Sequence, residues 1–370
     1  MSLLQFDGFD HYGAGTVSGT ATSDLRNGFL SNGFYTNTQN FVLGTAYGKN
    51  AGSLGAVLTS AISTTVNPVW IGKPIQPEQW KNATAYAPTA VLIFGFAFRL
   101  SSNPTGLLTV ARVAGHRLKI DSDFTVVAND TRTQYQIETN IWNYCELELN
   151  ITDGMYRVWM NDRKVSEFAI TAPVFDRWDL MAHYEATGTG TANQNFLQVD
   201  DYYLLDGSAT DMYGRASPNT RRLGKVNIAT RYPKADVAVA FTRSTGSTNF
   251  SLVDETAPNN DTDFVYSGAV GAQDLYSNTT DALAVTSENS VVAVAVATSA
   301  RMTEPDSISV GPIIKSGDQT VVGGRMGLKA ASYTMEKAIF ENDPATSARW
   351  RASAVTAMNW GHRVLERILT

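Results

Sequence analysis

Two glutamates, Glu146 and Glu148, are the best candidates for catalytic residues in this chain. Because residues two apart on a β-strand project to the same face, their carboxyl groups would lie side by side. Glycoside hydrolysis uses a pair of carboxyl groups of this kind. Motifs of other chemistries are absent as well: the sequence has no glycine-rich phosphate loop preceding a helix and no nucleophile elbow. We therefore expect both glutamates to be solvated surface residues and the chain not to be an enzyme.

A second group of acidic residues could bind a metal. Asp7, Asp10, Asp200 and Asp201 could hold Ca²⁺ if the first and last strands of a sandwich were neighbours, because Ca²⁺ takes several oxygen ligands. Aspartates that cap turns are the alternative interpretation, and we favour it. The four histidines are dispersed, with no His/Cys pair at zinc spacing. The sequence therefore predicts no cofactor.

Composition narrows the class of protein. The 370 residues are 43% hydrophobic and 17% charged, which is enough to bury at least one large core. A net charge of −6 without a basic cluster argues against nucleic acid as a partner. The N-terminus lacks the pattern of a signal peptide, and the longest apolar runs are too short to cross a bilayer. We expect no membrane insertion.

The two glutamates lie in the most regular stretch of the chain, residues 142–168. Cys145, Leu147 and Leu149 alternate with polar residues, as in a half-buried strand. Asp153–Gly154 and then Asn161–Asp162 predict two tight turns. The stretch therefore predicts three consecutive antiparallel strands, with the apolar set facing the core. The lone cysteine should behave as a small hydrophobic residue.

This meander carries a resemblance to a known fold. A Trp that opens an alternating strand, a Gly turn, an aromatic return strand and an Asn-Asp turn resemble the central hairpins of laminin-G-like, concanavalin-A-like sandwiches. Sandwich glucanases are similar too, although their pattern has an additional Asp and Glu that this strand lacks. The sugar-stacking candidates that go with a glycan-binding alternative are Trp70, Trp80, Tyr202 and Tyr203.

Residues 1–208 would form this sandwich. Residues 90–100 are apolar on both faces and predict a central buried strand. Residues 196–207 predict the final strand, which in the sandwiches it resembles lies beside the first. The opening Phe6-Asp7-Gly8-Phe9-Asp10 resembles the start of phage virion proteins that continue into a laminin-G-like sandwich.

Residues 209–370 carry the more specific resemblance. They are similar to a module in phage tail and virion proteins that act as structural components. The matching residues are Leu223-Gly224-Lys225-Val226, Pro233, Asn249-Phe250, Leu252-Val253-Asp254-Glu255, Pro258, Asp261, Val265, Gly271, Asp274, Tyr276, Asp343-Pro344-Ala345-Thr346, Trp350 and residues 354–361.

Local patterns predict the elements of this second part. Residues 291–297 read as a central strand, and Asp343–Pro344 as the start of a short helix before Trp350. The apolar tail should contact a neighbouring subunit through Trp360, Val364 and Leu365. The alternative is that the tail folds back onto its own module.

Together these patterns predict a mostly β protein: an antiparallel laminin-G-like sandwich over residues 1–208, and a β-rich attachment module with a short C-terminal helix over residues 209–370. The predicted function is that of a non-enzymatic phage tail protein in the virion. Other virion proteins and copies of this chain are the expected partners, with a host-surface glycan as a further one. A glycan-binding receptor-recognition protein is the alternative, and a polysaccharide-degrading glycoside hydrolase is the third hypothesis.

Overall fold

The computed structural model describes residues 1–17, 41–50, 53–59, 69–75, 87–170, 173–184, 196–211, 214–256, 259, 261–278, 291–303, 307–328 and 333–368. Within these ranges the chain is mostly β, in antiparallel sheets, with one short α-helix near the C-terminus. The predicted fold class is confirmed. In the described residues no helix has the length and apolar character to cross a membrane.

Two large sheets form the sandwich. The first contains nine strands in the order β13-β12-β11-β6-β15-β4-β3-β2, with β1 paired to β15. Its strands are β1 (Ser2–Asp7), β2 (Gly15–Val17), β3 (Phe41–Gly44), β4 (Gly55–Thr59), β6 (Val91–Leu100), β11 (Asn143–Asn150), β12 (Met155–Met160), β13 (Arg163–Ala169) and β15 (Phe196–Asp206). The second sheet contains β5 (Val69–Pro74), β7 (Leu108–Val113), β8 (His116–Ile120), β9 (Thr125–Ala128), β10 (Thr131–Gln136) and β14 (Arg177–Tyr184).

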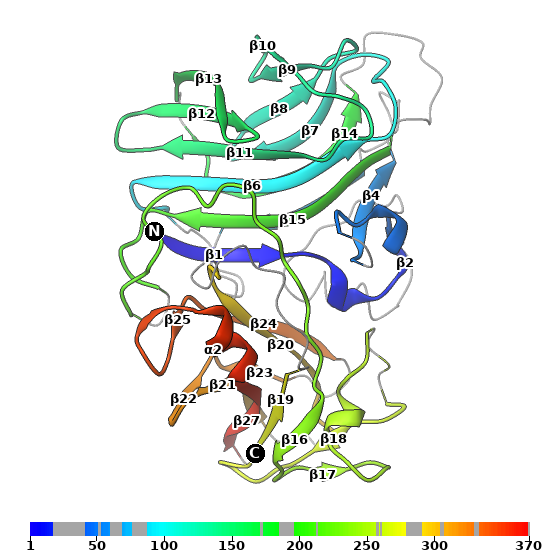
Figure 1. The fold of residues 1–370 in the computed structure, drawn as a ribbon, viewed down its shortest axis with the longest axis vertical. Helices are drawn as coiled ribbons and strands as arrows, with labels where there is room; N and C mark the ends of the chain where they lie inside the picture. Colours follow the sequence, from blue (N-terminus) through cyan, green and yellow to red (C-terminus); the bar gives the residue numbers. More distant parts are fainter. Residues whose placement is uncertain are drawn as a thin grey trace.

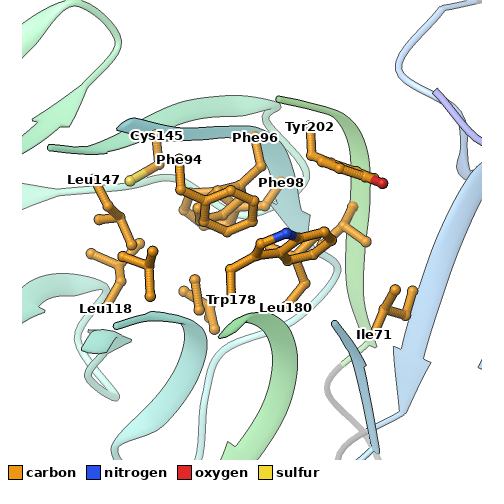
Figure 2. Close-up of a cluster of buried hydrophobic side chains, with 14 of the residues drawn as sticks. Ile71, Phe94, Phe96, Phe98, Leu118, Cys145, Leu147, Trp178, Leu180 and Tyr202 are labelled. Atoms are coloured by element: carbon orange, nitrogen blue, oxygen red, sulfur yellow. The ribbon is translucent and has the colours of Figure 1, made fainter. Parts of the chain in front are cut away.

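The core of the sandwich lies between these two sheets. Figure 2 shows side chains of β6 and β11 facing Leu118, Trp178 and Leu180 of the opposite sheet. Trp178 is fully buried, and its ring lies 4.7 Å from that of Phe94 and 4.6 Å from that of Tyr202. Its indole N–H donates to the Gln5 Oε1 atom of β1 at 2.8 Å. One residue therefore connects both sheets and the N-terminal strand.

The predicted meander is present. Cys145, Leu147 and Leu149 have 0% exposure in the core, so the predicted register of β11 is confirmed. Asn161 and Asp162 both adopt positive φ values, 49° and 68°, as a two-residue hairpin turn requires. At the first turn only Gly154 does so, because that loop is longer than two residues.

The C-terminal module contains a second set of sheets. Its largest sheet has the order β16-β19-β27-β21-β22, with β23 paired to β21. The strands are β16 (Ala235–Ala238), β19 (Gln273–Ser277), β21 (Ser307–Ser316), β22 (Gln319–Val322), β23 (Met326–Gly327) and β27 (Asn359–Ile368). Three two-stranded sheets join β17 (Thr242–Arg243) to β18 (Val265–Tyr266), β20 (Val294–Ala300) to β24 (Thr334–Phe340), and β25 (Asn342–Asp343) to β26 (Ala348–Arg349).

Two predicted elements of this module are corrected. The predicted central strand at residues 291–297 is β20, which among the described residues pairs with β24 alone. The helix, α2 (Ala352–Ala357), follows Trp350 instead of preceding it. Asp343 does cap a turn, accepting a hydrogen bond from the Ala345 amide at 3.0 Å, but Ser347 takes a left-handed φ of 55° and the chain returns as a hairpin.

The C-terminal tail is the central strand of its own module. β27 lies between β19 and β21, and Val364 has 0% exposure. This is the fold-back arrangement that the sequence left open as an alternative. Trp360 and Leu365 are half-buried. A subunit contact through these residues stays a prediction, and within this chain Val364 is not at the surface.

β1 lies at the boundary between the sandwich and the C-terminal module (Figure 1). The outer face of the nine-stranded sheet is apolar there, and Ile93, Tyr203 and Leu205 form one buried cluster with Ile339 of β24. Glu341 accepts hydrogen bonds from the Leu3 amide at 3.0 Å and the Asn219 side chain at 2.7 Å. The two parts of the chain therefore share a core. This explains why β6 is apolar on both faces.

Candidate functional site

A large cavity lies at this boundary. Its volume is about 1300 Å³, and its walls come from the end of β1, the segment 225–233, β20, β24 and β27. We call residues 225–233 the strap, because they run from the sandwich to β16 along one side of the cavity. Most drug-sized ligand sites are between about 300 and 1000 Å³, so this space is large enough for an extended ligand.

Aromatic rings occupy several positions in the wall. The ring of Tyr276 lies edge-on to that of Trp360 at 6.2 Å, and the Trp360 N–H donates to the Asn278 side chain at 2.8 Å. Tyr266 of β18 and Tyr333, which directly precedes β24, also line the cavity, and Tyr266 is 52% exposed. The Nε2 atom of His362 is buried in the wall without a hydrogen-bond partner. The cavity thus offers flat apolar surfaces beside polar atoms.

Acidic and amide side chains lie in the same wall. The Asn259 amide nitrogen donates to Glu255 Oε1 at 2.9 Å and also to Asp263 Oδ1. Burial, followed by the neighbouring Asp263, raises the pKa of Glu255. Asp261 accepts two hydrogen bonds of 2.8 Å from Arg301. These groups can donate to and accept from the hydroxyl groups of a ligand.

Asp7, one of the four predicted Ca²⁺ ligands, is buried beside the cavity and ion-paired. Its Oδ2 atom is 2.6 Å from the Lys337 ammonium and 2.8 Å from the Tyr12 hydroxyl, while Oδ1 accepts from the Phe9 amide. Burial alone would raise the pKa of Asp7, but Lys337 and then His11 outweigh burial and hold that pKa well below its usual range. The carboxylate therefore stays charged and joins β1 to β24.

The other three aspartates come together where β15 changes partner. Asp201 lies 2.5 Å from the Lys49 ammonium, and Asp200 accepts from the Lys49 amide at 2.7 Å. Asp10 accepts from the Leu54 amide at 2.6 Å. Their oxygens are directed at N–H groups, and among the described residues no three His, Cys, Asp or Glu side chains are arranged to hold a metal ion. These contacts are those of turn capping and ion pairing.

Glu146 does not lie where the sequence predicts. It has 2% exposure and accepts hydrogen bonds from the Tyr203 hydroxyl, the Arg222 guanidinium and the Gly224 amide, the last at 2.9 Å. The prediction of a solvated residue is wrong, because residues 222–224 cover this part of the outer sheet face. Arg222 in turn stacks over the Trp159 ring at 3.7 Å.

Glu148 is also partly buried, which corrects the same prediction. It pairs with Arg157 at 2.9 Å and accepts from the Trp159 indole at 3.1 Å. It lines a second crevice of about 440 Å³ together with Asn150, Arg221 and Arg222. Although the two glutamates project to one face, each has its own basic partner.

The isosteric substitutions Glu146→Gln and Glu148→Gln test whether Glu146 is more deeply buried than Glu148. We expect Glu146→Gln to lower the free energy of unfolding by about 1–3 kcal/mol, because it breaks a buried charged network. Glu148→Gln should cost less than about 1 kcal/mol, since its pair with Arg157 is closer to solvent and Arg157 has other acidic partners. Urea unfolding of both variants gives the comparison. Equal losses would contradict the assigned burial.

The structure describes the side chains of two of the four predicted sugar-stacking residues. Tyr202 and Tyr203 are buried, with 0% and 1% exposure, although Tyr203 borders the cavity. Trp80 and the side chain of Trp70 lie outside the described residues.

Sequence reasoning missed Lys49, Lys337 and Arg301. A single Lys or Arg in a polar loop or strand carries no periodic signal, and these three acquire their partners only through tertiary contacts.

Among known proteins, the fold of this chain has a limited likeness to several solved structures. No protein-family model matches the chain, and no curated protein sequence matches it. A sialidase structure matches with a TM-score of 0.38 at 12% identity, over 56% of this chain and only 19% of the sialidase chain. The PL-14 alginate lyase from Aplysia kurodai matches with a TM-score of 0.40 at 7% identity, over 56% of this chain and all of the lyase.

A third match is domain 4 of AbnA, a GH43 extracellular arabinanase from Geobacillus stearothermophilus, in complex with arabinotriose. Its TM-score is 0.34 at 12% identity, over 56% of this chain and 93% of that domain. All three are carbohydrate-active proteins by name. The prediction that the chain is not an enzyme is contradicted by these matches, which include enzymes, and it is withdrawn. TM-scores below 0.5 carry no argument for a particular activity.

Proposed function

We propose that this chain is a glycan-binding protein whose ligand occupies the cavity between the sandwich and the C-terminal module. The observation that carries the proposal is the wall of that cavity, where aromatic rings alternate with carboxyl and amide groups. Sugar rings have apolar C–H faces and polar hydroxyl edges. A site with a few placed polar groups among apolar and aromatic side chains matches both.

The residues best placed to contact such a ligand are Tyr266 and Tyr333, with Asp261 and Arg301 beside them. Tyr333 donates to Asp261 at 2.7 Å, and the Arg301 guanidinium lies over the Tyr333 ring at 5.5 Å. The pair holds the ring of Tyr333 in one orientation. A rigid aromatic ring loses little conformational freedom when a ligand stacks on it.

Tyr266→Ala is the sharpest test of glycan binding. We expect it to weaken binding of a glycan by about tenfold, because an exposed aromatic contact is worth about 1–1.5 kcal/mol. Its exposed position should leave the melting temperature nearly unchanged. A glycan array would identify a ligand, and calorimetric titration would then compare Tyr266→Ala with Ile141→Ala, an equally exposed residue of the sandwich.

Two outcomes would contradict the proposal. One is an array with no glycan bound by the full chain. The other is a bound glycan whose affinity is the same in Tyr266→Ala and in the unaltered chain, which would place the ligand elsewhere.

The predicted place in a phage virion stays a prediction that rests on the sequence resemblance. A place in the virion is compatible with glycan binding, because a host-surface glycan is one of the partners that the sequence predicts. Electron microscopy of a particle that contains this chain would show its position and copy number.

A further inference from the structure

β15 exchanges one of its neighbours part-way along its length. Its first half pairs with β4, from Phe196↔Thr59 to Val199↔Ala56, and its second half pairs with β1, from Tyr202↔Asp7 to Asp206↔Ser2. Asp200 and Asp201 lie between the two halves, and Asp201 has a left-handed φ of 47°. Neither residue belongs to a regular ladder on this side. The register shift at this point leaves both carboxyl groups beside Lys49.

Charge is unbalanced at this point of β15. Asp200 and Asp201 are each 1% exposed, and Asp10 is half-buried beside them. Lys49 is the cation in direct contact, 2.5 Å from Asp201. The other titratable groups that face this cluster are Asp7, which is paired with Lys337, and His11, Tyr144 and Tyr232. Of the three carboxyl groups, that of Asp201 contacts the Lys49 ammonium, whereas those of Asp200 and Asp10 accept from the backbone amides of Lys49 and Leu54.

The strap is held by the same groups. The Ile228 amide donates to Asp201 Oδ1 at 2.8 Å, and the Lys49 ammonium donates to the Val226 carbonyl at 2.6 Å. The Thr230 amide bonds to the Asp10 carboxyl group. Ile228 packs so closely on Gly8 that a Cβ atom there would lie 3.0 Å from it. The strap is one wall of the cavity.

We propose that Asp10, Asp200 and Asp201 make the strap a pH-dependent wall of the cavity, held against the sandwich at mildly acidic pH and released at alkaline pH. Release follows when more of these carboxyl groups are ionised than Lys49 can neutralise. The pH-dependent opening of the strap does not depend on which ligand the cavity binds.

The direction of the effect follows from the charges. Burial, followed by the charges of Asp7 and Asp201, raises the pKa of Asp10 to about 6 and outweighs the hydrogen bonds from the Leu54 and Thr230 amides, which lower it. Burial and then Asp201 raise the pKa of Asp200, while burial raises that of Asp201 against the opposing charge of Lys49. A raised pKa in the folded state stabilises the strap below the ordinary Asp pKa near 4, and this stabilisation is lost as pH rises through the folded-state values. The opening therefore belongs to neutral and alkaline pH.

Hydrogen exchange of the strap amides measures this opening directly. After correction for the intrinsic exchange rate, protection of residues 225–233 should fall by about tenfold or more between pH 5.5 and pH 8.5. A pKa difference of about one between the closed and the open strap changes the equilibrium constant for opening about tenfold. Trypsin cleavage after Lys225 and Arg231, calibrated with a peptide substrate at each pH, should rise in parallel. The lone thiol of Cys145 reports whether the sandwich stays closed.

Asp200→Asn is the decisive variant, because it fixes one of the three groups in a neutral form. We expect it to retain the acidic-pH protection at pH 8.5. Asp10→Asn provides the same test if Asp200→Asn does not fold, as judged by a reactive Cys145. Asp123→Asn is the matched control: it makes the same change at an exposed Arg132 ion pair and should keep the pH dependence.

Three results would overturn the inference: protection that is the same at both pH values, pH dependence that persists in both Asp200→Asn and Asp10→Asn, or labelling of Cys145 at the rate at which the strap opens. The last would mean that the sandwich unfolds as a whole.

Discussion

A chain truncated after Gly361 should lose the fold of its C-terminal module. The cut removes the part of β27 in which His362 and Arg363 pair with β19 and Val364 to Ile368 pair with β21. Because β27 is the central strand, the cut leaves only Asn359 to Gly361 between β19 and β21 and opens the rest of the sheet to water. We expect the truncated chain to lose the module's thermal transition and to be cleaved rapidly within residues 235–340, while Cys145 reacts slowly in a sandwich that is still folded.

The control for truncation is Glu366→Gln. It removes the exposed ion pair with Arg325 on the same strand and should cost less than about 1 kcal/mol. A truncated chain that keeps the full thermal transition but changes its mass in solution would contradict this expectation. That result would support the predicted subunit contact in place of fold-back.

Trp178→Ala should cause the largest loss of stability of any single substitution in the sandwich. Truncation of a fully buried Trp leaves a cavity, and such changes cost about 3–5 kcal/mol. Here the ring also stacks on Phe94 and packs against the tilted ring of Tyr202, and its N–H donates to Gln5, so both sheets and β1 lose a contact. Cys145 lies in the same core, so its reactivity at increasing urea concentration measures the stability of the sandwich alone.

Trp178→Phe separates packing from hydrogen bonding. It keeps an aromatic ring but removes the N–H donor to Gln5, so the expected cost is about 1–3 kcal/mol. If Trp178→Ala and Trp178→Phe lower stability equally, the hydrogen bond would outweigh packing. If neither lowers it by more than about 1 kcal/mol, the assigned core position would be wrong.

The sandwich was predictable because its strands carry local signals. Cys145, Leu147 and Leu149 alternate with polar residues, and Asn161–Asp162 fits the turn that follows, so period and turn chemistry agree. The same alternation misassigned Glu146, because alternation shows which residues share a face and does not show what covers the other face. In this chain a segment more than 70 residues away covers it.

The candidate site was less predictable for the same reason. Lys337 and Asp7 meet across 330 positions, and Lys49 and Asp201 across 152, so neither pair leaves a local pattern. Asp200 and Asp201 were correctly expected near Asp7 and Asp10, since the pairing of the first and last strands of a sandwich brings them together. Their observed partners, Lys49 and the amides of Leu54 and Ile228, come from residues that no spacing rule connects.

The position of β1 has a consequence for how the protein forms during synthesis. A ribosome makes Leu3 well before Glu341, whose carboxylate receives the Leu3 amide 338 positions later. Until then, the outer side of β1 and its neighbours would expose the apolar surface that Ile339 finally covers. Contacts this distant form slowly, and exposed apolar strands favour aggregation. The nascent sandwich should therefore depend on a chaperone, or on slow translation, until the C-terminal module emerges.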